Sequence, residues 1–225
     1  MRYHPPVSGG DEGDEAAIIR RLEELVSPKR LLHCQRVADL AESLALRWSL
    51  DHRLARRAGL LHDACRRPRP EWDALAAREG LTLPDWAAGE RGFLHGPLAA
   101  ILAREEFGLS AAWCLAIAGH TTGGPGMTAE EMVLFVADHA AVGREEPQAG
   151  EWRELAQRDL RQATLEQLSA RLSDLLAGGS ALWLPTVLAR NDLLVRSDAT
   201  LPAPPATPAT PVLPVESAHV TRRQQ

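Results

Sequence analysis

Gly59-Leu60-Leu61-His62-Asp63 is the stretch around which this chain is organised. An apolar helical run ends there in an imidazole and a carboxylate, and two arginines, Arg66 and Arg67, follow shortly after. Charged groups beside a buried apolar face are costly unless they are paired or bound to a metal. We therefore interpret His62 and Asp63 as the centre of a metal site.

The composition sets limits on the class of protein. A chain of 225 residues is enough for one sizeable core, and its net charge of -5 argues against a general nucleic-acid binder. The sequence shows no signal-peptide pattern and no apolar run long enough to span a membrane. The cysteines do not form a CxxC pair, so we expect a reducing, cytoplasmic location; they are Cys34, Cys65 and Cys114.

Apolar spacing, capping residues and proline breaks predict a single all-α domain over residues 14–196. Residues 1–13 and the Pro/Ala/Thr-rich tail, residues 197–225, are expected to be disordered. Thr128 and Glu131 have the spacing of a capping box. The expected helices cover about 14–26, 28–49, 51–63, 70–80, 97–107, 110–120, 128–138, 159–177 and 183–195, with a brief one after Pro84.

Histidines near expected helix ends or breaks supply candidate ligands. A single helical histidine is more often a surface or core residue, and His52 and His139 are given no role. His33 and Asp138 can close the site around His62 and Asp63 from other helices, with Asp63 as a candidate bridge. Two imidazoles and two carboxylates suit iron or manganese better than calcium or a structural zinc.

The pattern H…HD…D in an all-α chain resembles the HD-domain metal-dependent phosphohydrolases. Further segments, spread over about residues 15–196, resemble the bacterial YqeK family, which hydrolyses diadenosine tetraphosphate symmetrically to two ADP. The loop that follows His120 is the most specific of them. The segments are Arg30–His33, Ala58–Asp63, Leu94–Pro97, Gly119–Gly123, Pro125–Thr128, Val136–Asp138 and Ala189–Asn191.

This resemblance implies roles for individual residues. The metal, most readily iron, with manganese as the alternative, would be held by His33, His62, Asp63 and Asp138. The polyphosphate would be contacted by Arg30, Arg66, His95, His120 and Arg144. His95 and His120 are alternatively ligands of a second metal. The segment with Pro185 and Thr186 would wall the adenine, or would simply pack the last helix.

The resemblance also implies a mechanism. A water activated by the metal would attack an inner phosphorus, Asp63 would serve the reaction as a ligand, and His95 or His120 would donate a proton to the leaving oxygen. The substrate would be a dinucleoside polyphosphate and the product ADP. The chain is expected to be either a homodimer or a monomer.

The chain departs from the family pattern near the expected pocket. Gly124 and Met132 stand where the family usually carries basic residues, Arg66 stands for a common lysine, and Ala140–Val142 replaces an Ile-Glu-Pro stretch. These departures bear on affinity and substrate range. Two other functions therefore stay open: an HD hydrolase for a different nucleotide, and a nucleotide sensor without turnover. A docking role for the Pro-rich tail is a third.

Overall fold

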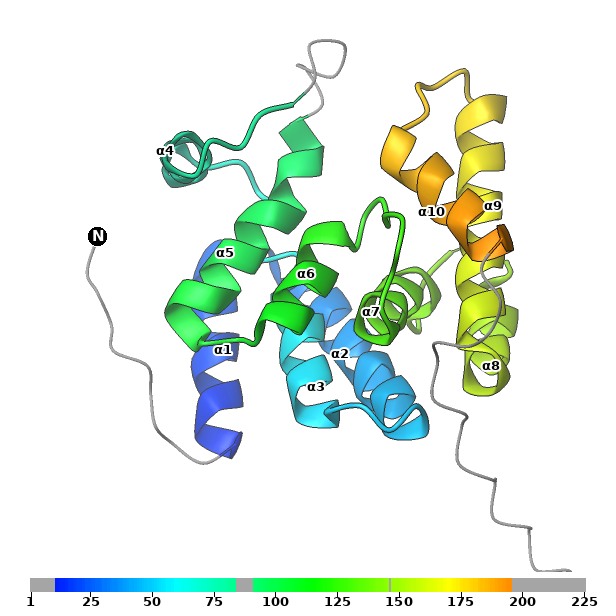
Figure 1. The fold of residues 1–225 in the computed structure, drawn as a ribbon. Coiled ribbons are helices and arrows are strands. Elements are labelled where there is room, and N and C mark those ends of the chain that lie inside the picture. The colour runs from blue at the N-terminus through cyan, green and yellow to red at the C-terminus, as the bar shows by residue number, and fades with distance from the viewer. Residues whose placement is uncertain (1–10, 84–90, 146, 196–225) are drawn as a thin grey trace, which may run out of the picture.

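The computed structural model describes residues 11–83, 91–145 and 147–195, and within these ranges the chain forms helices and no strand (Figure 1). The prediction of an all-α fold is confirmed. The helices are α1 Asp11–Leu25, α2 Pro28–Arg47, α3 His52–Leu61, α4 Pro70–Arg78, the 3-10 helix η2 Arg91–Leu94, α5 His95–Phe107, α6 Ala111–Gly119, α7 Ala129–Ala140, α8 Ala149–Arg158, α9 Leu160–Ala177 and α10 Leu184–Val195.

Helices α2 and α3 pack side by side because small residues meet between them. A methyl group on Gly59 would lie only 2.5 Å from the Cα atom of Ala38. Both helices begin as their sequences predict. The Ser27 hydroxyl accepts from the Arg30 N–H at the start of α2, and the Asp51 carboxylate caps the first turn of α3. The close approach holds these two helices at a fixed spacing.

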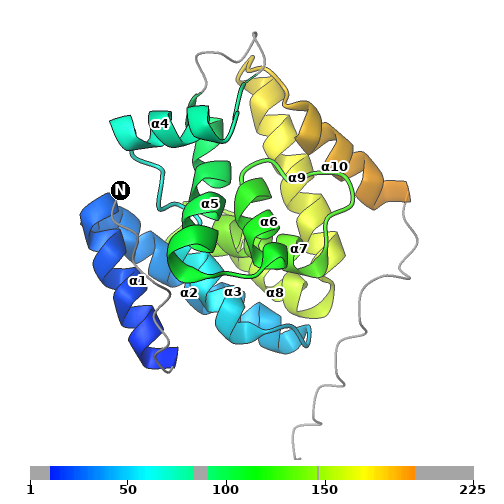
Figure 2. The same ribbon diagram turned by 60° about the vertical axis from the view of Figure 1, so that its left-hand side comes forward.

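Helix α7 lies near the centre of the molecule (Figures 1 and 2). It contacts α2, α3, α6, α8 and α9, and its residues from Met132 to Asp138 are all buried. A helix that is apolar on nearly every side must be enclosed by others. Its first turn carries the capping box predicted from Thr128 and Glu131. The buried carboxylate of Asp138 therefore sits at the end of a rigid central helix.

Helix α8 was not predicted from the sequence. Ala149, Trp152 and Ala156 form its buried face, at helical spacing, and this short pattern follows a proline. The indole N–H of Trp48, which directly follows α2, donates to the Ala156 carbonyl over 2.9 Å and so connects α8 to the end of α2. Helices α8 to α10 occupy the right-hand side of Figure 1, with α9 against α7, α8 and α10.

Several boundaries differ from the prediction. Helix α1 begins at Asp11, three residues before the expected start near Asp14. Helix α5 begins at His95, not at Pro97, because η2 leads directly into it. The brief helix expected after Pro84 falls in residues 84–90, outside the described residues, as do residues 1–10 and the tail. No helix among those described has both the length and the apolar character needed to cross a membrane.

Candidate metal centre

Three helices bring the predicted metal ligands together. His33 lies on α2, His62 and Asp63 directly follow α3, and Asp138 lies on α7. The Asp138 Oδ1 atom is 3.0 Å from His33 Nε2 and 3.6 Å from His62 Nε2. The Asp63 Oδ2 atom is 3.5 Å from His62 Nε2 and 3.9 Å from His33 Nε2. The structure thus gathers all four predicted side chains around one point.

His62 and Asp63 lie at the point where α3 passes into a tighter turn. Consecutive helical side chains point about 100° apart, which would separate the two groups. Here α3 ends at Leu61, and the next residues form a tight turn, closed by hydrogen bonds from the Ala64 N–H to the Leu61 carbonyl and from the Arg66 N–H to the Asp63 carbonyl. The end of α3 at Leu61 therefore coincides with the position of His62 and Asp63.

Two further histidines lie on the other side of Asp63. His95 begins α5 and His120 follows α6, and their Nε2 atoms are 3.0 Å apart. The Asp63 Oδ1 atom is 3.1 Å from His95 Nε2 and 3.8 Å from His120 Nε2. Each Asp63 oxygen therefore serves a different pair of imidazoles, and the carboxylate has the position of a bridge between two neighbouring donor groups.

Backbone carbonyls set the orientation of these rings. His62 Nδ1 donates to the Gly59 carbonyl and His120 Nδ1 to the Ile117 carbonyl, each over 2.7 Å and each three residues back. A proton fixed on Nδ1 leaves Nε2 with a lone pair, which is the arrangement of a metal-binding histidine. The Nε2 atoms of His33 and His62 are buried and have no hydrogen-bond partner among the described residues. Such atoms fit a metal ion.

The charges of the centre favour a cation. Burial is the largest single influence on the pKa of Asp138 and raises it, but His33 and His62 outweigh burial and hold this pKa well below its usual value. Burial also lowers the pKa of His62, yet Asp63 and Asp138 together raise it above its usual value. Burial lowers the pKa of His120 to about 3, so its ring is neutral near pH 7. In this neutral form His120 offers a lone pair to a metal ion, and its role as proton donor stays a prediction.

The three arginines predicted to contact the polyphosphate lie beside the histidine and aspartate cluster. Arg30 donates to Asp63 Oδ2 over 2.8 Å, and Arg66 lies 3.2 Å from a ring nitrogen of His95. Arg144 holds Asp138 by its carbonyl, at 2.6 Å, and also by its carboxylate. Its NH1 group has no recorded partner within the described ranges and can face a substrate. The structure thus combines a cation-binding cluster with a rim of guanidinium groups.

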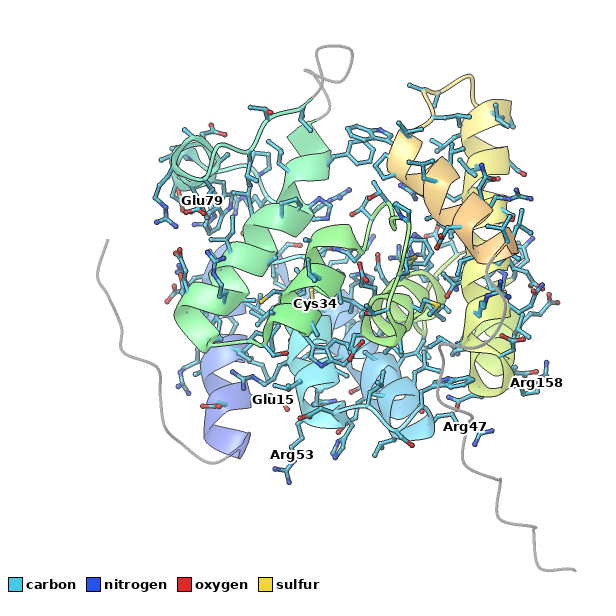
Figure 3. All side chains as sticks on the ribbon, in the orientation of Figure 1. Glu15, Cys34, Arg47, Arg53, Glu79 and Arg158 are labelled. Atoms are coloured by element: carbon cyan, nitrogen blue, oxygen red, sulfur yellow. The ribbon has the colours of Figure 1, made fainter. Side chains whose placement is uncertain are left out.

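Other predicted positions are less closely connected. Pro185 is exposed and Thr186 is buried at the start of α10, and among the described residues neither one makes a hydrogen bond or ion pair with the histidine cluster. Thr121 was missed, although it directly follows His120; its hydroxyl lies 3.2 Å from His120 Nε2. Cys34, labelled in Figure 3 in the interior of the bundle, is adjacent to His33, and burial raises the pKa of its thiol. The raised pKa disfavours the thiolate, which is the form of cysteine that binds metals.

Comparisons with known proteins agree with this geometry. The family model of the HD domain matches residues 30–143. The chain is 32% identical to the symmetrical bis(5'-nucleosyl)-tetraphosphatase of Bacillus subtilis (strain 168), over 77% of this chain and 94% of that protein. It is also 32% identical to the protein of the same name from Halalkalibacterium halodurans, over 76% of this chain and 95% of the relative.

A solved structure has the same fold. The crystal structure of a predicted HD superfamily hydrolase involved in NAD metabolism, from Clostridium acetobutylicum, superposes with a TM-score of 0.76 at 32% sequence identity. The match covers 81% of this chain and 98% of the other. The similarity therefore includes almost the whole of that protein, and it is not limited to the helices around the histidines.

Proposed function

The chain belongs to the HD-domain family, in its branch of symmetrical bis(5'-nucleosyl)-tetraphosphatases, and we propose that it hydrolyses diadenosine tetraphosphate to two ADP at its metal centre. The observation that carries this proposal is the convergence of buried imidazole nitrogens and two carboxylates inside a rim of three arginines. The cluster can hold a cation, and the rim matches a chain of phosphates.

The metal would be held by His33, His62, Asp63 and Asp138, and we propose that it is iron, with manganese as the alternative. Mixed imidazole and carboxylate ligands suit these ions. When bound, such a divalent ion acts as a Lewis acid and makes a water molecule acidic enough to be a nucleophile near neutral pH. The thiols of Cys34, Cys65 and Cys114 are free, which supports our proposal of a reducing cytoplasm.

The reaction places demands that these residues can meet. Water attacks one inner phosphorus, and the bond from that phosphorus to the central bridging oxygen breaks, so each half leaves as ADP. Arg30, Arg66 and the NH1 group of Arg144 orient the phosphates and stabilise charge on their oxygens. Because the terminal phosphate of ADP has a second pKa of about 6, the leaving group does not need a protonated histidine near pH 7. A neutral His120 is consistent with that chemistry.

Product analysis and metal content test this function together. We expect the purified full-length protein to contain iron or manganese, and to convert diadenosine tetraphosphate into ADP alone. Removal of the metal by a chelator should abolish turnover, and added Fe²⁺ or Mn²⁺ should restore it. ATP with AMP as products, or turnover of a different nucleotide only, would assign the chain to another HD hydrolase. Binding without turnover would make it a sensor.

The contribution of the arginine rim can be measured at Arg30. We expect Arg30→Ala to lower kcat/KM for diadenosine tetraphosphate by about 100-fold, because a charged donor is removed from the phosphates. Metal content should not fall, since Arg30 competes with a cation for Asp63. Arg67→Ala is the matched control, because Arg67 is an exposed arginine that follows the turn with His62 and Asp63. Loss of metal in Arg30→Ala would show that Arg30 supports the ligands and not the substrate.

A further inference from the structure

A cavity lies between α7, α8 and α9, and its wall includes His139, the residue that follows Asp138. Its volume is about 220 Å³. Helices α7, α8 and α9 contact one another pairwise (Figure 1), and residues of all three form its wall. The side chains on its wall combine aromatic, amide and charged groups, among them His139, Trp152, Gln167, Ala170, Arg171 and Asp174.

Gln167 is the unusual member of this wall. Its side chain is only 1% exposed, and neither Nε2 nor Oε1 has a hydrogen-bond partner among the described residues. A buried amide without partners is costly, and native proteins rarely keep one without a use. The side chain offers one donor and one acceptor side by side. This pair of groups is complementary to a planar heterocycle that carries an acceptor and a donor on neighbouring atoms.

Arg171 links the cavity to the metal centre. It lies one helical turn after Gln167 on α9 and lines the same cavity. Burial is the largest influence on its pKa and lowers it; Asp138 counteracts burial, and Arg66 and Arg144 add to the lowering. The guanidinium group is therefore close enough to interact electrostatically with the Asp138 carboxylate and with Arg66 and Arg144. No hydrogen bond or ion pair is recorded for it within the part of the chain that the structure describes, so it can contact an anion that extends from the centre.

We propose that this cavity binds the purine base of one nucleoside of the dinucleoside tetraphosphate, with Gln167 on the base edge and Arg171 on the adjoining phosphates. This proposal rests on the proposed function and names where half of the substrate lies. Adenine presents N7 as an acceptor beside the N6 amino donor, and a glutamine amide pairs with both. The cavity, of about 220 Å³, is smaller than a typical pocket for a whole ligand, so we assign it to the base alone.

The other wall residues suit a flat aromatic ring. Trp152 offers an indole, and stacking on aromatic side chains is a common way to hold a base. His139 is stacked on Phe135, with ring centroids 4.6 Å apart, and its Nδ1 donates to the Phe135 carbonyl. Its ring is therefore fixed, and it forms a rigid part of the wall. These contacts would hold a base next to Asp138, where a phosphate chain can reach the metal ligands.

Gln167→Leu separates a binding role from a structural one. The variant removes the buried unpaired amide, so we expect its Tm to rise by about 3 °C. Its KM for diadenosine tetraphosphate should rise about tenfold with kcat unchanged, because a contact made equally in ground and transition state is lost. The metal-loaded wild type should bind two ADP per chain in a calorimetric titration, and Gln167→Leu only one.

Gln162→Leu is the control on the same helix, since the Gln162 amide bonds Glu166 at the surface. It should keep the KM and the two ADP sites. A wild type that binds one ADP per chain, or a Gln167→Leu protein with unchanged KM and unchanged ADP binding, would overturn the proposal. If the wild type releases no ADP from diadenosine tetraphosphate, the proposed function is wrong. The number of ADP molecules bound by the wild type and by Gln167→Leu then tests by itself whether the cavity binds a base.

Discussion

Asp63→Asn should lose its bound metal and nearly all activity, with kcat falling on the order of 1000-fold. The reason is the place of Asp63 between two donor groups. One of its oxygens faces His33 and His62, and the other faces His95 and His120. An amide keeps the shape of the side chain but replaces one oxygen by a donor NH₂ group and removes the negative charge. Elemental analysis and product assays on the purified variant measure both effects.

The matched control is Asp39→Asn, which changes a carboxylate paired with Arg56 at the surface. Exposed pairs contribute little, so metal content and kcat should stay at the wild-type level. Circular dichroism would show that both variants are folded. An Asp63→Asn protein that keeps the metal and the wild-type rate would remove Asp63 from the centre, and the proposed chemistry with it.

The proximity of the four proposed ligands could be predicted from the sequence because metal-binding residue types are few and costly to bury. His33, His62, Asp63 and Asp138 lie in segments that must be helical by their apolar spacing, so their presence near helix ends already indicated a shared centre. The same holds for Arg30, whose spacing from His33 places both on one face of α2. The pattern of residue types therefore carried most of the information about the centre.

The remaining features depend on tertiary contacts that a local pattern does not contain. The lowered pKa of His120 follows from its complete burial and from the neighbouring His62, and both arise only where α6 meets α3. Helix α8 is short, and its apolar face becomes clear only where it packs on Trp48. The cavity at Gln167 brings together three helices, so a lone glutamine in an amphipathic helix gave no signal.

Gly59→Ala should cause the largest loss of stability of any small substitution near the centre, about 3 kcal/mol in the free energy of unfolding. The new methyl group would lie 2.5 Å from Cα and 2.8 Å from N of Ala38. Both are main-chain atoms, so no side-chain rotation relieves the overlap, and α3 must move away from α2. Because α2 carries His33 and α3 leads into His62 and Asp63, we expect metal content to fall with stability. Urea denaturation and elemental analysis measure the two losses.

Two comparisons decide whether this close approach is the cause. Gly150→Ala makes the same change in α8, where a methyl group meets nothing within 4 Å, so stability should not fall and should rise by at most about 0.5 kcal/mol. Ala38→Gly, added to Gly59→Ala, should restore little, because the overlap involves the main chain of residue 38 and not its methyl group. Full rescue by Ala38→Gly would mean that side-chain crowding is responsible. In that case, Gly59 would not set the distance between α2 and α3. The stretch from Gly59 to Asp63 would then contribute to the metal centre only the side chains of His62 and Asp63.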